Sequence, residues 1–271
     1  ALRLCPQLAI RPANWERIRA CSRQVMAVLA DYGPLEKMSV DEAYLDLSDE
    51  ADPVATAAAI RTAVKRETGL PCSVGLATGK LVAKVASDHD KPEGFTVVEP
   101  GSEAAFLAPL PTRALHGVGP RTAEKLAAMQ ITTCAELAQA DPRQMQRRFG
   151  KYGRVMVKRA QGIDPRRVKP DRGPAKSISQ EWTFTEDVNA PAVLRAQLAK
   201  MSKSVAGSLQ KRQLVAHTVF IKFRWADFTT FTRQKSFEVG IDQAEDIQRV
   251  GVAIWEEHWP PGQRMRLLGI G

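Results

Sequence analysis

The pattern of secondary structure changes twice along this sequence of 271 residues. Residues 13–102 mix short strand patterns with helical ones, residues 103–168 carry only short helical patterns broken by Gly and Pro, and strand patterns return from residue 177. A segment without strands does not extend the sheet of either neighbour. We therefore expect an α+β protein of several domains, long enough to bury more than one core.

Residues 13–102 are expected to form an α+β domain with a mixed sheet. A strand hairpin opens this part, which argues against a doubly wound parallel sheet. Helical periodicity and strand alternation predict the remaining elements. The predicted helices cover 14–31, 53–68 and 80–87, and the predicted strands cover 35–40, 43–48, 71–77 and 95–98.

Prolines, a glycine and basic residues crowd into residues 169–176, which is typical of a linker. We place the linker at 171–175 and begin the last domain at 176. Its patterns follow the order β-α-β-β-α-β, which predicts a four-stranded sheet backed by two helices. The predicted strands cover 177–184, 214–225, 229–240 and 264–270, and the predicted helices cover 191–212 and 242–258.

Apolar runs and cysteines indicate the cellular setting. The longest apolar run is far shorter than the ~20 residues that a membrane span needs, so no membrane association is expected. Scattered cysteines without a C-x-x-C pair predict neither a zinc site nor a disulfide framework, and they favour the cytoplasm. Because the sequence opens with Ala1 and not Met, we expect it to be part of a longer protein.

The net charge of +9 is unevenly distributed. Residues 1–102 carry 12 Lys/Arg and 14 Asp/Glu, whereas residues 103–271 carry 27 and 16. A basic surface attracts polyanions, nucleic acid above all, because neutralised phosphates release their counterions. The alternative is a charged surface that only keeps the protein in solution.

Two adjacent carboxylates, Asp41 and Glu42, lie between the first two predicted strands. Successive strand side chains point to opposite faces, so both can reach one site only if the backbone turns there. Such a turn could hold Mg²⁺, and two Mg²⁺ ions assist phosphoryl or nucleotidyl transfer. The alternative is a solvated acidic turn.

Two lysines, Lys80 and Lys84, lie four residues apart on one predicted helix and so share a face. They could contact a triphosphate as two point charges, or they could form a solvated basic face. The glycine spacing before Lys80 is not that of a P-loop.

Residues 110–126 have the layout of a helix–hairpin–helix. Glycines let a phosphate approach the backbone closely, and amides at the start of the next helix can bind it. Such contacts bind the DNA backbone and not its sequence; the alternative is a turn that only needs glycine. A branched side chain at Gly119 would also strain the hairpin if φ is positive there. The predicted DNA-binding residues here are Gly117, Val118, Gly119, Arg121, Thr122 and Lys125.

Basic residues also lie on or beside the predicted strands of the last domain. Lys176 precedes the first strand, and alternate residues on a strand share a face. The pairs that share a face in this way are Lys222 with Arg224, Arg233 with Lys235, and Arg264 with Arg266. We predict DNA contacts from Lys176, Arg264 and Arg266; the alternative is an outward polar face.

Taken in order, these motifs resemble those of one family. The motifs are Ser39-Val40-Asp41-Glu42-Ala43-Tyr44-Leu45-Asp46, Lys80 to Asp88 with Lys91-Pro92-Glu93-Gly94, Leu115-His116-Gly117-Val118-Gly119, and Lys176-Ser177-Ile178. From end to end the chain resembles the Y-family translesion DNA polymerases, in the DNA polymerase IV branch. The resemblance implies the end of a fingers domain at 1–12, a truncated palm at 13–102, a helix–hairpin–helix thumb at 103–170 and a little finger at 176–271.

The resemblance also implies a function: template-directed DNA synthesis across damage by two Mg²⁺ ions. Asp41 and Glu42 match the second and third catalytic carboxylates, and Lys84 matches a lysine that contacts the incoming triphosphate; Lys80 is assigned to nucleotide binding with it. The implied partners are primer–template DNA, a deoxynucleoside triphosphate and a sliding clamp, with the protein itself a monomer.

Two departures from the family pattern stand out. The family's opening strand, with the first metal-binding Asp and the aromatic steric gate, is not among these 271 residues, and Gly79 stands where the family usually has Asn. We therefore expect the chain by itself to be inactive. The alternative function is a DNA-binding module without catalysis.

Overall fold

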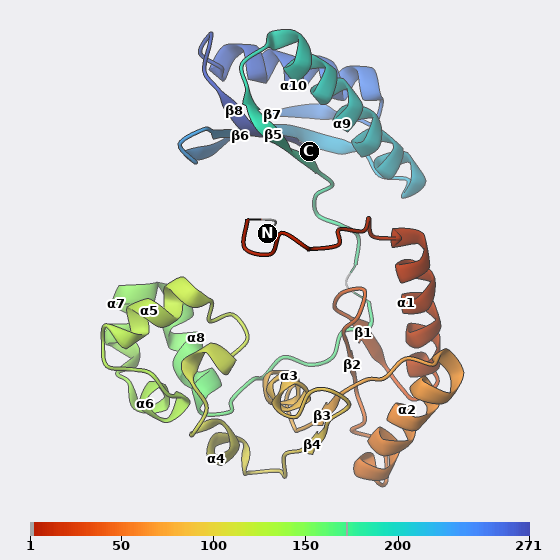
Figure 1. The fold of residues 1–271 in the computed structure, drawn as a ribbon, viewed down its shortest axis with the longest axis vertical. Coiled ribbons are helices and arrows are strands. Elements are labelled where there is room, and N and C mark those ends of the chain that lie inside the picture. Colours follow the sequence, from red (N-terminus) through yellow and green to blue (C-terminus); the bar gives the residue numbers. More distant parts are fainter. Residues whose placement is uncertain (1–2, 172) are drawn as a thin grey trace. The chain divides into compact units, whose positions relative to one another are not determined.

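The computed structural model describes residues 3–171 and 173–271. Residues 1, 2 and 172, which belong to the predicted end of the fingers and to the predicted linker, lie outside the described residues. The chain divides into two compact units, Ala1–Arg172 and Gly173–Gly271 (Figure 1). The border between the units falls within the predicted linker, whereas the division of the first unit into palm and thumb stays a prediction.

The first unit begins with two helices that pack on a hairpin. These elements are α1 (Trp15–Ala30), β1 (Leu35–Lys37), β2 (Ala43–Leu45) and α2 (Pro53–Thr68). The Asn14 and Asp52 side chains cap α1 and α2 by accepting hydrogen bonds from backbone N–H groups. Val28, Ile60 and Val64 form the centre of the small core between the helices.

A crossover unit follows, in which β3 (Val74–Leu76) and β4 (Phe95–Val97) pair in parallel around α3 (Lys80–His89). A Cβ on Gly75 of β3 would lie only 2.2 Å from the Ala83 carbonyl oxygen, so glycine lets this strand lie against α3. The predicted strands are confirmed but shorter. They form one antiparallel pair, β1–β2, and one parallel pair, β3–β4.

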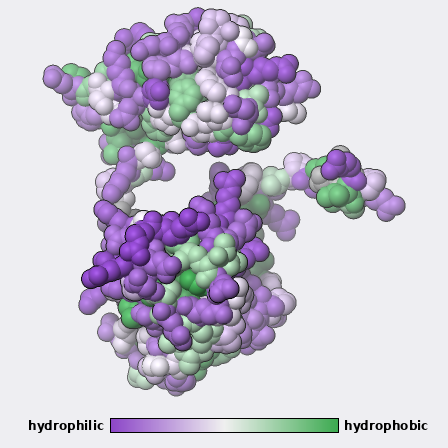
Figure 2. Space-filling view, turned by 90° about the vertical axis from the view of Figure 1, so that its left-hand side faces the viewer, coloured by the Kyte–Doolittle hydropathy of each residue, from purple (hydrophilic) through white to green (hydrophobic). Residues whose placement is uncertain are grey.

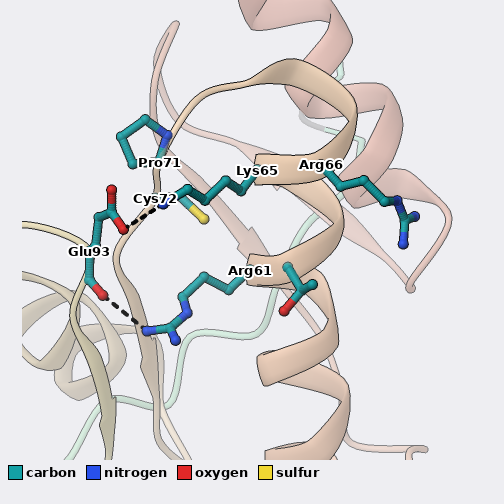
Figure 3. Close-up of a pocket in the computed structure, with 7 residues that line it drawn as sticks. Arg61, Lys65, Arg66, Pro71, Cys72 and Glu93 are labelled. Carbon is teal, nitrogen blue, oxygen red and sulfur yellow. Dashed lines mark hydrogen bonds and ion pairs between the residues drawn. The ribbon is translucent and has the colours of Figure 1, made fainter.

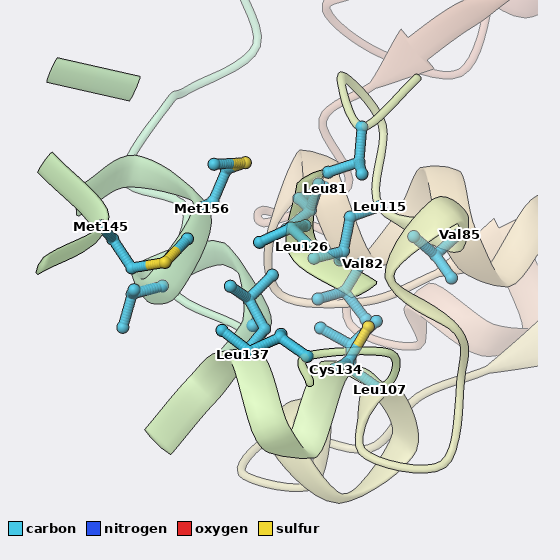
Figure 4. Close-up of a cluster of buried hydrophobic side chains, with 14 of the residues drawn as sticks. Leu81, Val82, Val85, Leu107, Leu115, Leu126, Cys134, Leu137, Met145 and Met156 are labelled. Atoms are coloured by element: carbon cyan, nitrogen blue, oxygen red, sulfur yellow. The ribbon is translucent and has the colours of Figure 1, made fainter. Parts of the chain in front are cut away.

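The rest of the first unit is helical, as predicted for residues 103–168. Its helices are α4 (Glu103–Leu107), the 3₁₀ turn η1 (Thr112–Ala114), α5 (Pro120–Ala127), α6 (Cys134–Gln139), α7 (Pro142–Phe149) and α8 (Lys151–Ala160). Their apolar residues share one core with α3, where Leu81, Val82 and Val85 join Leu107 and Leu126 (Figure 4). The helix that carries Lys80 and Lys84 is therefore packed against the helical part of the unit.

The second unit is the predicted β-α-β-β-α-β domain. Its elements are β5 (Gln180–Val188), α9 (Pro191–Lys211), β6 (Ala216–Trp225), β7 (Thr230–Ile241), α10 (Ala244–His258) and β8 (Met265–Ile270). The strands form an antiparallel sheet in the order β5-β8-β6-β7, and the two helices cover one face of it (Figure 1). Leu198, Phe223, Trp255 and Leu268 are fully buried between the sheet and these helices.

Hydrophilic side chains cover most of each unit on the face shown in Figure 2. Among the described residues, no helix combines the length and apolar character that a bilayer span requires. Cys5, Cys21, Cys72 and Cys134 are all unpaired in the part of the chain that the structure describes.

Candidate active site and nucleic-acid interface

The β1–β2 turn carries the two predicted catalytic carboxylates. The amides of Met38 and Ser39 both donate to the Glu42 carbonyl, at 2.9 and 3.2 Å, and so close the turn before β2 begins. The exposed Asp41 carboxylate accepts a 2.5 Å hydrogen bond from the Ser39 hydroxyl. The backbone therefore turns at Asp41 and Glu42, as the hypothesis of a shared site requires.

Lys84 on α3 faces this turn. Its ammonium lies 3.0 Å from Glu42 Oε1 and 2.6 Å from Asp88 Oδ2. Burial lowers the Lys84 pKa, but the hydrogen bonds that the ammonium donates to Asp88 and Glu42 outweigh it, and the net pKa is raised. Both carboxylate partners of the charged ammonium are half-exposed. A nucleotide could therefore replace them.

Lys80 shares the α3 face with Lys84, as predicted, but its surroundings differ. Its side chain is only 9% exposed and forms an ion pair with the equally buried Glu36 of β1. The ammonium also lies 4.8 Å above the Tyr44 ring and 3.5 Å from the Arg167 carbonyl oxygen. These partners enclose the ammonium, so the geometry does not support the predicted contact between Lys80 and a triphosphate.

The turn offers two carboxylates as ligands for Mg²⁺. Mg²⁺ keeps several waters and is usually held by one or two carboxylates together with substrate phosphates. Asp41 and Glu42 fit that pattern. Within residues 3–171 and 173–271, no group of three or more His, Cys, Asp or Glu side chains could hold a metal ion.

The helix–hairpin–helix layout is present, and its two glycines have different roles. Gly117 has φ +98°, and a Cβ there would lie 2.1 Å from the Tyr152 hydroxyl oxygen. Gly119 has φ −79°, which any residue adopts, and nothing lies within 4 Å of the Cβ position. The expected backbone strain therefore belongs to Gly117, whereas Gly119 leaves open space for a phosphate.

The described residues show which amides of the hairpin are open. Val118 offers no free amide, because its N–H donates to the Leu115 carbonyl at 2.9 Å, and its side chain is buried; its predicted contact with DNA stays a prediction. The amide of Thr122 also has a partner, because it donates to the Gly119 carbonyl at 3.0 Å. The amides of Gly119 and Arg121 have no hydrogen-bond partner among the residues described, as is usual at a helix N-terminus.

Exposed cations lie on α5 and on two later helices of the same unit. Arg121 and Lys125 both lie exposed on α5, as predicted. Sequence analysis missed a second basic group, which lies on α7 and α8. Its exposed members are Arg143, Arg147, Arg148, Lys151, Arg154 and Lys158.

Two further residues of α8 hold the hairpin and were also missed. Arg159 Nη1 donates to the His116 carbonyl at 3.1 Å and to the Tyr152 hydroxyl at 3.0 Å. Only the fold brings them together, because they lie 43 and 36 residues after His116. No pattern in the sequence signals this contact.

The predicted pair of basic residues on β6 and the predicted pair on β7 lie on opposite faces of the sheet. Lys222 pairs with Gly269 and Thr232, on the face away from the helices, whereas Arg233 pairs with Ile221 of the core. The expectation that a pair shares a face holds for Lys222 with Arg224 and for Arg233 with Lys235, and the β6–β7 register places these two pairs on opposite faces. For Arg264 with Arg266 it stays a prediction, because Arg264 precedes β8 and Arg266 lies at a bulge. Lys222 is also ion-paired with Glu181 at 2.8 Å.

The three basic residues assigned to DNA binding in this unit differ in exposure and in their ion-pair partners. Lys176 and Arg264 are exposed. Arg266 is the extra residue at a bulge of β8, where it forms an ion pair with Asp187 at 3.0 Å and lies over the Phe228 ring at 4.4 Å. Arg266 is therefore less available to a phosphate than Arg264.

One pocket of about 380 Å³ lies apart from all the predicted site residues. It opens between α2 and the loop that holds Glu93, with Cys72 in its wall (Figure 3). Glu93 already binds two of its cations: Lys65 to the carboxylate and Arg61 to the backbone carbonyl, each at 3.0 Å. These existing bonds leave the pocket without a clear ligand.

Comparisons with known proteins agree with this arrangement of parts. Residues 1–88 match the impB/mucB/samB family, residues 175–271 match the C-terminal domain of that family, and residues 113–164 match the thumb domain of DNA polymerase-iota. The chain is similar in fold to a Y-family DNA polymerase chimera of Dbh, with a TM-score of 0.83 over 99% of this chain and 79% of the other, at 20% identity. It also resembles DinB from Sulfolobus solfataricus, with a TM-score of 0.60 over 99% and 80% of the two chains, at 21% identity.

Relatives at higher identity extend along almost the whole chain. A DNA polymerase IV of Bacillus cereus is 37% identical over all of this chain and 66% of its own length. Those of Lactococcus lactis subsp. cremoris and Methanoculleus marisnigri are 37% and 39% identical, over 98% and 100% of this chain and 75% and 76% of their own lengths. The chain therefore belongs to the Y-family DNA polymerases, among the relatives named DNA polymerase IV. It spans about two thirds of the length of the Bacillus relatives.

Proposed function

We propose that this protein is a template-directed DNA polymerase that copies damaged DNA by nucleotidyl transfer. The observation that carries the proposal is the β1–β2 turn, which presents Asp41 and Glu42 beside Lys84. Membership of the family supports it. A sliding clamp as partner, a monomeric state and a cytoplasmic location remain predictions.

In the proposed reaction, the primer 3′-hydroxyl loses its proton and attacks the α-phosphate of the incoming nucleotide, the bond between the α- and β-phosphates breaks, and pyrophosphate leaves. Asp41 and Glu42 would hold Mg²⁺, which when bound stabilises charge on the attacking and leaving oxygens. Lys84 would exchange Glu42 and Asp88 for triphosphate oxygens, and this exchange leaves the Glu42 carboxylate open. The Glu42–Lys84 ion pair is thus the resting state of the two groups.

The thumb hairpin would hold the duplex by its phosphates. The amides of Gly119 and Arg121 can donate to one phosphate at the N-terminus of α5, and Arg121 and Lys125 add charge beside it. Bonds of this kind contact the DNA backbone and not the base edges, which suits a polymerase that must accept any sequence.

Removing Arg121 or Lys125 is expected to lower the salt dependence of DNA binding. Each neutralised phosphate contributes a slope of roughly −0.9 in log affinity against log salt concentration, so each alanine variant should reduce the magnitude of the slope by about one unit. The measurement is a salt titration of duplex binding by this chain on two unrelated DNA sequences.

Arg249→Ala is the matched control, because Arg249 is also an exposed basic residue and lies on α10, on the helix side of the second unit. Its slope should equal that of the wild type. Unchanged slopes for both α5 variants would place the DNA elsewhere. A loss confined to one of the two sequences would indicate base recognition and contradict the proposal.

The chain of 271 residues is expected to bind primer–template DNA without extending it. The described residues provide two carboxylates at the turn and no third ligating side chain beside them. Gel-shift binding and primer extension on the same DNA separate the two properties. Nucleotide incorporation by the purified chain would show that the catalytic residues are misplaced, and absence of DNA binding would also remove the alternative function of a binding module.

Primer extension by the full-length protein tests the proposed function itself. Extension that depends on Mg²⁺, on all four nucleotides and on the template, and that continues past an abasic site, is the expected result. A full-length protein that binds the DNA but incorporates no nucleotide would leave the DNA-binding module as the better function.

A further inference from the structure

A buried ion pair links the catalytic hairpin to α3 beneath the candidate site. Glu36 on β1 and Lys80 at the start of α3 have side chains only 7% and 9% exposed. Removing two charges from water is costly unless good geometry and further hydrogen bonds compensate. Those bonds come from a distant part of the chain, because the Lys169 amide donates to Glu36 Oε2 at 2.9 Å and Lys80 approaches the Arg167 carbonyl.

The same distant segment caps α3. Gly79, at the N-cap position, has no side chain to offer. The Asp164 carboxylate accepts the Leu81 amide at 3.0 Å instead, with its own side chain only 2% exposed. Arg166 holds Asp164 in turn with two bonds of 2.7 Å. Residues 164–169, which leave the last thumb helix, are therefore fixed to both the hairpin and α3.

Two ion pairs thus join the hairpin to α3, and they differ in exposure. The Glu36–Lys80 pair is buried, whereas in the Glu42–Lys84 pair the carboxylate is 43% exposed. Under the proposed function the second pair must open when a nucleotide binds. The first pair cannot separate in this way to bind a nucleotide, because Glu36, Tyr44 and the Arg167 carbonyl surround the Lys80 ammonium.

We propose that Glu36, Lys80 and the Asp164–Lys169 segment form a clamp that positions the Asp41–Glu42 turn relative to Lys84 while a nucleotide occupies the site. Lys80 is then a positioning residue and does not contact the triphosphate. The inference rests on the proposed function, and it assigns roles to Glu36 and Asp164 that sequence motifs do not signal.

Two single substitutions distinguish a clamp from direct contact between Lys80 and the triphosphate. In the full-length protein, Glu36→Gln and Lys80→Met should each raise the KM for the nucleotide by about tenfold or more, because small displacements of reacting groups are costly. The affinity for primer–template DNA should stay unchanged. If only Lys80→Met raises the KM, Lys80 contacts the triphosphate and the clamp is wrong; wild-type KM in both variants also overturns it.

The cap of α3 provides a test with a conservative rescue. Asp164→Ala should raise the KM for the nucleotide, and Asp164→Asn, which can still accept the Leu81 amide, should restore it in large part. Asp141→Ala is the matched control, because Asp141 caps α7 in the same way through the Arg143 and Gln144 amides but does not contact the clamp. An equal KM change in the control would show that general loss of helix stability is responsible and would refute the proposal.

Hydrogen exchange tests the clamp without measuring activity. In this chain, Asp164→Ala should speed hydrogen exchange at the amides of Leu81 and Lys169, whereas Asp141→Ala should not. The double variant Glu36→Gln/Lys80→Met removes both buried charges together and should fold better than either single variant, yet keep a raised KM. A folded double variant with wild-type KM overturns the clamp. A wild-type protein that does not extend primers refutes the proposed function instead, and unchanged exchange in Asp164→Ala refutes the clamp alone.

Discussion

Replacing Asp41 or Glu42 with alanine in the full-length protein is expected to reduce primer extension by about 10³-fold or more. Loss of a metal-binding carboxylate removes several kcal/mol of transition-state stabilisation, and each 1.36 kcal/mol corresponds to about a factor of ten in rate. DNA affinity should change little, since the phosphate contacts are expected on the thumb and little finger. Single-turnover extension and equilibrium DNA binding, measured on the same samples, give the two quantities.

The fold should tolerate both substitutions. Asp41 is exposed and bonds to the neighbouring Ser39, and Lys84 keeps Asp88 when Glu42 is removed. Asp49→Ala, which removes an exposed carboxylate a few residues further along the chain, is the control and should extend primers at the wild-type rate. Near wild-type extension in both turn variants would end the assignment of this turn as the catalytic site.

Opposite effects are expected from alanine at Gly117 and valine at Gly119. Gly117→Ala places a methyl group against the Tyr152 hydroxyl on a backbone with φ +98°, and it should cost about 1–3 kcal/mol of stability. Gly119→Val fits the extended backbone and the open space, so it should cost less than about 1 kcal/mol of stability. The branched side chain should instead obstruct a phosphate and weaken DNA binding by about tenfold.

Thermal unfolding and duplex binding, measured for both variants, test whether Gly117 contributes to stability and Gly119 to DNA binding. The combination Gly117→Ala/Tyr152→Phe removes the hydroxyl nearest to the new methyl group and should recover part of the lost stability. Equal DNA affinity for Gly119→Val and the wild type would show that no phosphate approaches Gly119. Greater instability in Gly119→Val than in Gly117→Ala would contradict the backbone geometry.

Local signals in the sequence predicted most elements of this fold. The caps at Asn14 and Asp52 are set by side chains that lie within three residues of the amides they bind. The β-α-β-β-α-β order follows from alternation and periodicity within single elements, so residues 177–270 were predicted in the correct order. The Asp41–Glu42 turn was predicted for the same reason, because two strands of a hairpin require a turn between them.

The strand lengths, the faces and the buried charges could not be predicted in this way. The β6–β7 register places Arg233 on the same face as Ile221, and a register is set by the packing of two strands and not by either one alone. Val118 looked available within its motif, but the hairpin uses its amide and buries its side chain.

The sequence alone determined the order of the elements, the family and the position of the acidic turn, because each depends on residues that are close together along the chain. Only the tertiary structure distinguished the surroundings of the two lysines of α3. They have the same residue type and lie on the same helix face, so no local pattern distinguishes them. Lys84 meets half-exposed carboxylates, whereas Lys80 is enclosed by Glu36 and by a segment 87 residues away. Burial is a property of the whole packed unit, and burial is what separates an exchangeable charge from a fixed one.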